Sequence, residues 1–347
     1  PAHHRRERDP VSKSPVHCRL ARPGEEEEII RFVNRHFDWK LPLINLAEYF
    51  QYYYCVDGQV QFALAEADGE WQAAAGYILA SRDSQPDLWV SVWVAKKGCN
   101  GAGLELMAAL PGLTGARVIA CHNIRPETRP FYEFLGWHTG RVGHFYRMAD
   151  LPEYRLARPV GGRLPVSGDL LLDEVGSVTR LQALGLPPCS HTPHKDLWYI
   201  SRRYFRFPHR SYQLYSVGEK GKLLAYLALR LEEAFWEEGE LPPVKVLRVV
   251  DYIGDEALLP RLGAALDRLL AESGAEYADW YCAGIDPALL AGAGFTQRKE
   301  GDGALIPNYL TPIAPENTEY YYFTSQAEGF TLFKADGDQD RPNLPVY

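Results

Sequence analysis

The stretch Trp93–Leu110, WVAKKGCNGAGLELMAAL, decides the fold. An apolar strand-like segment enters a turn containing Gly98, Gly101 and Gly103, and a helix-forming segment rich in Ala and Leu leaves it at once. Such a turn uncovers backbone N–H groups and directs the positive end of the helix dipole at one point, which favours phosphate binding. Close strand–helix packing also selects glycine, so both interpretations stay open. The spacing matches neither a P-loop nor a dinucleotide-binding turn.

Length and charge narrow the class of protein. The chain has 347 residues and a net charge of −8, which favours two domains and argues against a nucleic-acid partner. Residues 1–15 lack the apolar segment of a signal peptide, and no apolar run reaches membrane-spanning length. Since no apolar run is long enough, no membrane association is expected. The six cysteines form no CxxC pair, which predicts free thiols and a cytoplasmic location: Cys18, Cys55, Cys99, Cys121, Cys189 and Cys282.

Periodicity and turn residues predict the same order of elements twice. The first half reads as a strand at 16–23, a helix at 24–37, a hairpin at 61–81 turning at Asp68–Gly69, strands at 87–95 and 115–123, a helix at 129–140 and a closing strand at 143–150. The second half reads as a hairpin at 211–233 turning at 218–221, a strand at 244–254, a helix at 255–274, a strand at 277–284 and a short helix at 286–295. This repetition indicates a tandem duplication.

The Pro-, Gly- and Arg-rich stretch 151–165 separates the two halves. We therefore predict a tail at 1–15, a domain at 16–150, a linker at 151–165 and a second domain at 166–347. The expected fold class is α/β (α+β), with a mixed, largely antiparallel twisted sheet flanked by helices in each domain.

The first half resembles the GNAT superfamily of acyl-CoA-dependent N-acyltransferases. The resemblance covers roughly residues 16–150 and rests on the glycine turn, on Gly76 in the preceding hairpin, and on the "FYEFLGW" helix with Phe131, Tyr132, Gly136 and Trp137. The sequence departs from the family at Gly98, where Arg or Gln is usual, and Lys96 or Lys97 supplies a positive charge nearby.

The resemblance implies binding of acetyl-CoA or another short acyl-CoA and attack of an amine on the thioester. It implies that Tyr132 protonates the leaving sulfur and that a backbone N–H near Val94 polarises the thioester carbonyl. The alternative for Tyr132 is an aromatic packing residue. The implied CoA-contacting residues are Val94, Lys97, Gly98, Cys99, Asn100, Gly101, Ala102, Gly103, Asn123 and Phe131.

The second half resembles another GNAT unit without the glycine turn, because "DYIGDEALL" (251–259) replaces it. The phrases "HKDLWYISRRYFRFPHRSY", "RVVDYIG", "IPNY" and "FKADGDQDRPN" are similar to tandem-GNAT sugar N-acyltransferases of bacterial surface-polysaccharide pathways. That resemblance implies an amino-deoxysugar linked to a nucleotide, dTDP by expectation, as the acyl acceptor. The implied acceptor-contacting residues are Arg202, Arg203, Tyr204, His209, Tyr212, Asp251, Tyr252, Asn308, Tyr309, Asp336, Asp340 and Arg341.

Two clusters suggest roles for charged side chains. Arg202, Arg203 and Arg206 suit phosphate, although a salt-bridged strand edge explains them equally. The run Asp336, Asp338 and Asp340 suits an ammonium group, with Asp338 as the candidate catalytic carboxylate, although a solvated tail is the plain alternative.

Metal binding is not expected. The acidic run lacks the glycine and closing Glu of a calcium loop, and the possible zinc set of Cys189, His191 and His194 has no fourth ligand.

Two alternatives to a sugar N-acyltransferase stay open: an N-acyltransferase that acts on a peptide or antibiotic amine, and a CoA-binding protein without catalysis. A monomer or a homodimer is expected.

Overall fold

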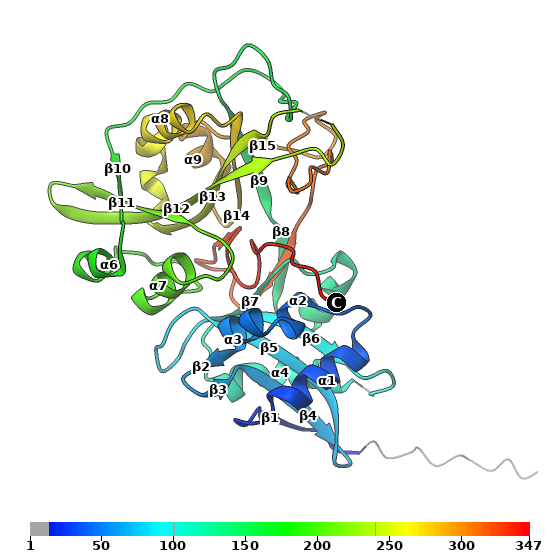
Figure 1. Ribbon diagram of the computed structural model, residues 1–347. Coiled ribbons are helices and arrows are strands. Elements are labelled where there is room, and N and C mark those ends of the chain that lie inside the picture. The colour runs from blue at the N-terminus through cyan, green and yellow to red at the C-terminus, as the bar shows by residue number, and fades with distance from the viewer. Residues whose placement is uncertain (1–13, 100, 240) are drawn as a thin grey trace, which may run out of the picture. The chain divides into compact units, whose positions relative to one another are not determined.

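The computed structural model describes residues 14–99, 101–239 and 241–347, and Figure 1 shows its elements in order. The chain divides into two compact units. The first contains 14–76 and Val92–Thr114, and the second contains Tyr77–Ser91 and Gly115–Pro345. The strands β5 (Glu70–Leu79) and β6 (Leu88–Ala95) contribute residues to both units.

The first unit contains strands in the order β1-β4-β5-β6, with β1 (His17–Leu20) antiparallel to β4 (Phe62–Ala67). The predicted hairpin is confirmed, because β4 pairs antiparallel with β5 and the turn residues Asp68 and Gly69 have φ angles of 53° and 74°. Gly76 is needed for packing, since a Cβ there would lie 2.8 Å from the Phe62 ring. The unit also contains the short strands β2 (Cys55–Val56) and β3 (Gln59–Val60).

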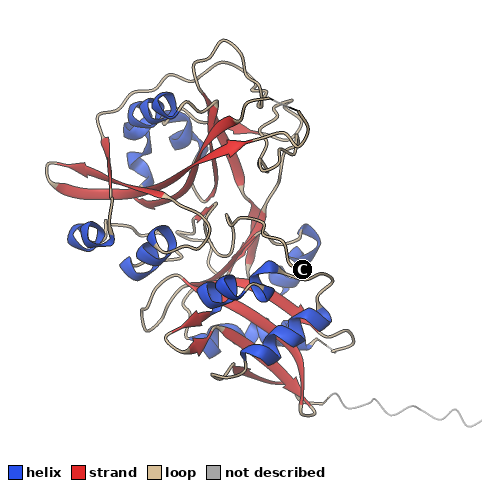
Figure 2. Ribbon diagram, viewed as in Figure 1, coloured by secondary structure: helices blue, strands red, loops and turns tan. Residues whose placement is uncertain are grey.

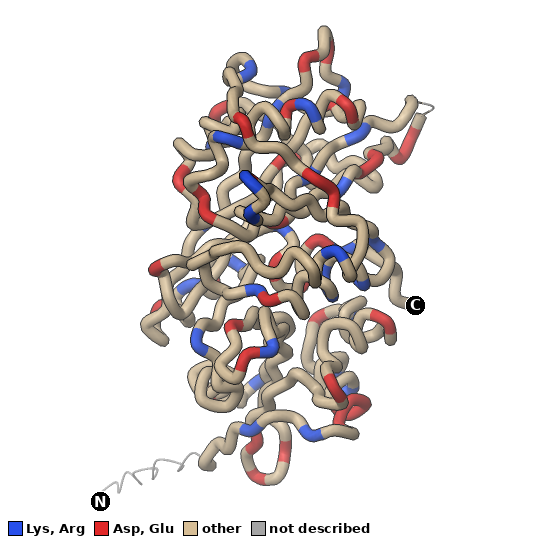
Figure 3. Tube along the Cα trace, turned by 90° about the vertical axis from the view of Figure 1, so that its left-hand side faces the viewer, with Lys and Arg blue, Asp and Glu red and all other residues tan. Residues whose placement is uncertain are grey.

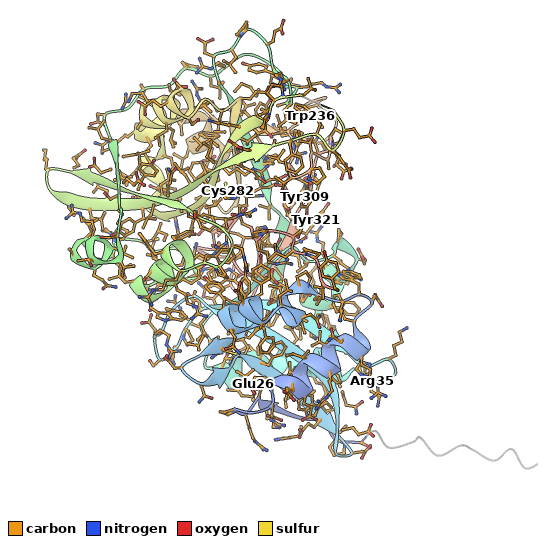
Figure 4. All side chains as sticks on the ribbon, in the orientation of Figure 1. Glu26, Arg35, Trp236, Cys282, Tyr309 and Tyr321 are labelled. Atoms are coloured by element: carbon orange, nitrogen blue, oxygen red, sulfur yellow. The ribbon has the colours of Figure 1, made fainter. Side chains whose placement is uncertain are left out.

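Four helices belong to the first unit: α1 (Glu26–His36), α2 (Pro42–Asn45), α3 (Ala47–Tyr54) and α4 (Ala102–Thr114). The helix α1 confirms the prediction for 24–37 and buries Ile29 and Val33, which are four residues apart and share one face. Figure 4 labels Glu26 and Arg35 near its two ends, so acidic and basic groups match the helix dipole. The helix α4 packs against β1 and β4.

In the second unit, one sheet runs in the order β5-β6-β7-β16-β8. The strand β7 (Ile119–His122) is parallel to β6, whereas β16 (Tyr321–Thr324) is antiparallel to β7 and to β8 (His138–Arg141). The predicted helix at 129–140 is shorter, α5 (Arg129–Phe134), and it follows the 3₁₀ turn η1 (Pro126–Thr128). A strand from near the end of the chain therefore completes a sheet built from the first half.

The other sheet of the second unit runs in the order β10-β11-β12-β13-β14-β9-β15. Its members are β9 (Gly143–Met148), β10 (Leu171–Glu174), β11 (Gln213–Glu219), β12 (Lys222–Ala234), β13 (Val244–Gly254), β14 (Tyr277–Ala283) and β15 (Thr296–Arg298), and β17 (Leu332–Phe333) pairs with β14. The strand predicted at 143–150 is present as β9, but the prediction that it completes the sheet of the first half is wrong. It pairs instead with β14 and β15, which are both strands of the second half. Pairing partners rather than chain order decide which sheet a strand joins.

The helices of the second half are α6 (Val178–Leu184), α7 (Leu197–Phe205), η2 (Glu256–Leu262, 3₁₀), α8 (Gly263–Ser273) and α9 (Pro287–Gly292). Figure 2 shows α8 and α9 beside the sheet, and their leucines share one apolar core with Val217, Val249 and Trp280. The strand-edge alternative for 201–210 is wrong, because Asp196 caps α7 by accepting from the Tyr199 N–H.

The tandem repeat is confirmed at the level of element order. Each half has an antiparallel hairpin, a third strand, a helix and a parallel fourth strand: β4-β5-β6-α4-β7 in the first and β11-β12-β13-α8-β14 in the second. A short helix and a strand then follow in each. Among the described residues, no helix is both long enough and apolar enough to cross a membrane. Figure 3 shows acidic and basic residues interspersed along the trace.

Candidate functional site

The glycine turn has the backbone geometry that a strand-to-helix anion site needs. Gly98 and Gly101 have φ angles of 77° and 86°, which L side chains rarely adopt, and α4 begins at Ala102. Two amides of the turn are used internally, because Cys99 donates to the Lys96 carbonyl and Ala102 to the Cys99 carbonyl, both at 3.2 Å. The predicted CoA contact Asn100 lies outside the described residues. The binding of a diphosphate by the remaining amides stays a prediction.

Packing explains the third glycine of this turn. A Cβ at Gly103 would lie 3.0 Å from the Ala95 Cβ, and Trp93 Nε1 donates to the Gly103 carbonyl at 3.1 Å. Val94 is buried in β6, whereas Lys97 is exposed. Glycine is therefore favoured for its backbone conformation at Gly98 and Gly101 and for close packing at Gly103.

Tyr132 lies on α5 with its ring buried and stacked on Phe323 of β16, with the ring centroids 4.1 Å apart. Burial raises the pKa of this phenol well above its ordinary value, so the group is protonated at neutral pH and is able to act only as a proton donor. The neighbouring Phe131 has an exposed fraction of 51% and points away from the core. The stacking on Phe323 shows that Tyr132 has a packing role, whatever else it does.

A cavity of ≈ 370 Å³ in the second unit contains several of the predicted acceptor residues. Its lining is linked to β6 and β7, because Asn123 directly follows β7 and Asp338 accepts a hydrogen bond from Ser91 of β6. The lining residues are Asn123, Arg210, Arg230, Glu232, Arg248, Asn308, Tyr309, Leu310, Thr311, Pro312, Tyr320, Lys334, Asp338, Gln339, Asp340, Arg341, Pro342 and Asn343. Asn123 has a φ of 72° and lines this cavity.

The segment 334–341 forms one wall of this cavity and separates the three predicted aspartates. Asp338 is half-buried in the wall, where its Oδ2 accepts from Ser91 of β6 at 2.6 Å and its Oδ1 accepts from Gln339 Nε2 at 2.6 Å. It is the aspartate whose position suits the role of base or ammonium contact. Arg341 also lines the cavity, and its buried Nε has no hydrogen-bond partner in the described part of the chain. This guanidinium is available to an anionic group.

The other two aspartates of the run have structural ion-pair partners, although Asp340 also lines the cavity; only for Asp336, which does not line it, is the predicted contact with substrate wrong. Asp336 is fully buried and pairs with Lys195 Nζ at 2.7 Å, which also pairs with Asp251 of β13 at 2.7 Å. Asp340 accepts two bonds from the Arg230 guanidinium and one from Tyr212 OH at 2.8 Å. Burial alone would raise the pKa of Asp340, but Arg230 holds it well below its ordinary range.

One member of the basic cluster, Arg203, is structural, whereas Arg206 is exposed. Arg203 has an exposed fraction of 1%, and it donates to the carbonyls of Ala335 and Gln339 at 3.1 Å. The guanidinium thus anchors the segment that forms the cavity wall and does not reach a phosphate. Tyr204 donates to Asp251, and both are buried. Burial explains these corrections, since hydrogen-bonding groups removed from water must find partners within the protein.

The remaining predicted acceptor residues are divided between core, helix surface and loop. Tyr252 is buried in the core of the second sheet and donates to the Asp255 carbonyl at 2.7 Å, so its predicted contact with the acceptor is wrong. Arg202 lies 5.5 Å from the centroid of the Trp198 ring on α7, and His209 is exposed. Neither of these two lines the cavity.

A polar network that the sequence did not reveal forms the floor of the cavity. Lys334 Nζ donates to Asn308 Oδ1 at 2.5 Å, Asn308 Nδ2 donates to Tyr320 OH at 2.7 Å, and Tyr320 OH donates to Tyr309 OH at 3.4 Å. Tyr309, labelled in Figure 4, has an exposed fraction of 44% and lies at the rim. Burial, and then the nearby Arg248 guanidinium, lower the pKa of Lys334 to about 7. The cavity therefore contains an amine that is partly neutral at physiological pH.

The sequence analysis did not predict several charged residues that line the cavity: Arg210, Arg230, Glu232, Arg248 and Lys334. Arg230 also pairs with Glu232 at 2.7 Å, and Arg248 lies 3.6 Å from Asp279 of β14. Three of these residues could have been found in the sequence, since "LRLEE" in β12 and "VLRVV" in β13 place Arg230, Glu232 and Arg248 among apolar strand residues. A buried strand carries an Arg only where the Arg has a partner. In the described part of the chain, no three or more His, Cys, Asp or Glu side chains are placed so that they could hold a metal ion together. Cys189, His191 and His194 therefore do not form such a group.

Known structures share this fold. The GCN5-related N-acetyltransferase of Anabaena variabilis superposes with a TM-score of 0.52 at 12% identity, covering 89% of this chain and 72% of that one. A probable N-acyltransferase from Enterococcus faecalis V583 superposes with a TM-score of 0.51 at 13% identity, covering 91% and 74%. No protein-family model and no curated protein matches the sequence. The chain thus has the fold of the GNAT N-acyltransferases, in two mixed sheets flanked by helices.

Proposed function

We propose that this protein is an acyl-CoA-dependent N-acyltransferase that binds its amine acceptor in the cavity beside β6 and β7. One observation carries the proposal. A polar cavity of ≈ 370 Å³ is lined by Asp338, Lys334 and Arg341, and Asp338 accepts a hydrogen bond from Ser91 of β6. These charged and hydrogen-bonding groups suit an amine that loses a proton when it attacks a thioester.

On the donor side, the glycine turn at the start of α4 would hold the CoA diphosphate through backbone amides, with Lys97 adding positive charge. The amide near Val94 would polarise the thioester carbonyl. The amine then attacks the carbonyl carbon, the C–S bond breaks, and the CoA thiolate takes a proton from the Tyr132 phenol. Burial keeps this phenol protonated at neutral pH, so that it holds a proton to donate.

On the acceptor side, the cavity suits a small amine that also carries a negative charge. Arg341 supplies a guanidinium whose buried Nε has no partner in the described residues, and Asp338 accepts hydrogen bonds where an ammonium would approach. Asp338 would take the proton that the amine loses, either directly or through water. A nucleotide-linked amino sugar, dTDP-linked by expectation, combines an amine with a diphosphate and is our specific proposal for the acceptor.

Turnover and binding assays test the proposal together. CoA affinity is measured by calorimetry, and free thiol release is followed with acetyl-CoA and dTDP-3-amino-3,6-dideoxyhexoses. We expect release with the amino sugar and about tenfold slower turnover in Tyr132→Phe at unchanged CoA affinity. A panel of peptide and aminoglycoside amines as acceptors tests the sugar specifically. Binding of CoA without thiol release for any of these amines would instead support a non-catalytic CoA-binding protein.

A further inference from the structure

The loop between α6 and α7 holds three reactive side chains away from the cavity described above. It contains Cys189, His191 and His194, and it is fixed at two points. Thr192 exchanges backbone hydrogen bonds with Gly329 and Thr331, both at 2.9 Å, and the His194 N–H donates to Asp87 Oδ2 at 2.7 Å. The loop is therefore preorganised by hydrogen bonds from both directions.

His191 is positioned between a carboxylate and a thiol. Its Nε2 lies 2.6 Å from Glu256 Oε2, at the start of η2. Its ring is buried, with an exposed fraction of 9%. Its Nδ1 has no hydrogen-bond partner within the described residues. Cys189, two residues earlier, interacts with this imidazole and contacts the Gly254 carbonyl at 3.9 Å. A thiol, an imidazole and an orienting carboxylate are the components of an activated nucleophile.

The electrostatics agree with this arrangement. Burial would raise the pKa of the Cys189 thiol, but its interactions with the side chain and amide of His191 bring it below its ordinary value. Burial would lower the pKa of His191, but Cys189 and Glu256 together raise it. Both shifts act in the direction of a thiolate beside an imidazolium, and thiolates are the reactive form of cysteine.

Two cavities meet at this thiol. A polar one of ≈ 410 Å³ is lined by Cys189, His191 and His194 with Ser81, Asp83, Gln85, Asp87, Arg117 and Ser190. A recess of ≈ 20 Å³ is also lined by Cys189, His191 and His194, together with the apolar Leu186, Pro187, Pro193 and Ile253 and the polar Lys195, Tyr252 and Thr331. The larger polar chamber suits the polar carrier of a short-chain acyl thioester, and the apolar side chains of the recess suit a small acyl group.

We propose that Cys189, His191 and Glu256 form a second, thioester-reactive site that accepts a short acyl group on the cysteine. The Cys189 thiolate attacks the carbonyl carbon of the thioester, and a new C–S bond forms. The bond to the carrier sulfur breaks, and the departing thiolate takes the proton from the His191 imidazolium. The product is an S-acyl cysteine, and Glu256 acts as a positioning residue that holds the imidazole ring. This reaction needs neither the glycine turn nor Tyr132.

The test uses the full chain and S-acetyl-N-acetylcysteamine, a thioester without any diphosphate. Its reaction therefore reports on this site independently of CoA binding, and failure here leaves the proposed N-acyltransferase function intact. We expect intact-mass spectra to show one acetyl adduct, and peptide mapping to place it on Cys189. Cys189→Ser should abolish the adduct, whereas Cys55→Ser, which changes a half-exposed cysteine on β2, should retain it.

Two further variants separate activation from folding. His191→Asn should slow adduct formation about 100-fold, and Glu256→Gln should slow it less, with thermal unfolding unchanged in both. The pH midpoint of iodoacetamide alkylation at Cys189 should rise in His191→Asn. The titratable and charged groups around this thiol are His191, His194, Lys195, Asp83, Asp87, Arg117, Tyr252 and Glu256.

Three results would overturn the proposal: an adduct on another residue, an adduct rate in His191→Asn equal to that of the unchanged protein, or alkylation of Cys189 by iodoacetamide without any acetylation by the thioester. The last result would show a reactive thiol whose surroundings do not accept an acyl group.

Discussion

The two repeats each contain a parallel strand pair that parts, and they differ in how the resulting opening is occupied. In the first repeat, β6 and β7 part beside the cavity, where Asp338 bonds to Ser91. In the second, β13 and β14 pair from Val246↔Tyr277 to Val249↔Trp280, and β17 then pairs with β14, while the Ala335 N–H donates to the Val250 carbonyl at 3.0 Å. The same architecture leaves an open site in one repeat and a filled one in the other.

The difference teaches that duplication copies a fold without copying its site. The first repeat has the glycine turn before α4, whereas the second passes from Gly254 directly into η2, capped by Asp255. A single segment, 332–341, fills the second opening with Leu332–Phe333 and lines the first with polar groups. We therefore expect polar side chains beside the second opening to contribute to the free energy of unfolding, and those beside the first to contribute to the rate of acyl transfer.

The largest effect is expected beside the filled opening. Lys195→Met leaves Asp251 and Asp336 buried without their counter-charge, which should lower the free energy of unfolding by about 3–5 kcal/mol. Urea unfolding measures this, with the exposed Lys222→Met as the matched control, which should change it by less than about 0.5 kcal/mol. Equal values for the two variants would contradict the structural role of this cluster.

Beside the open cavity, the expected effect is on rate. Asp338→Asn keeps the size and most hydrogen bonds of the side chain but removes the charge, so acyl transfer should slow about 100-fold. Unfolding free energy should change by less than about 1 kcal/mol, because the side chain is only half-buried. Asp173→Asn, on the exposed strand β10, is the control for kinetics. A rate loss that is matched by a loss of stability would remove Asp338 from the chemistry.

The pH dependence of stability tests the environment of Lys334. Its folded-state pKa of about 7 lies below the ordinary value of 10.5, so between these pH values the folded protein binds fewer protons than the unfolded chain. Unfolding free energy should therefore rise with pH from 7 towards 10, by at most about 1.4 kcal/mol per pH unit. The difference between the unchanged protein and Lys334→Met isolates this contribution, and the exposed Lys245→Met is the control. A pH-independent difference would mean that Lys334 is charged in the folded state.

The smallest effect concerns the two glycines of α4. Gly103→Ala brings a Cβ 3.0 Å from that of Ala95 and should destabilise by about 1 kcal/mol. Gly112→Ala meets nothing within 4 Å on the same helix and should stabilise by about 0.5–1 kcal/mol through helix propensity. Thermal unfolding of the two variants measures both signs. A stabilising Gly103→Ala would contradict the packing role of this glycine.

Local features of the fold were predictable from the sequence. The hairpins, the helix at 26–36 and the glycine turn depend on residues a few positions apart, such as Asp68–Gly69 and the apolar pair Ile29 and Val33. Six residues of the candidate site were named from sequence and do line the cavity: Asn123, Asn308, Tyr309, Asp338, Asp340 and Arg341. The repetition of element order was likewise visible, because each element carries its own periodicity.

Only the tertiary structure decided the membership of β9 and β16 in their sheets and the different roles of the three alternating aspartates. Asp336, Asp338 and Asp340 are equivalent in the sequence, yet Lys195 and Arg230, more than 100 positions away, bind the first and the last. The pairing of a buried charge depends on what approaches it in space, and sequence spacing does not encode that approach. The physical reason is desolvation, which makes a buried group depend on its partners and leaves a half-exposed one free to act.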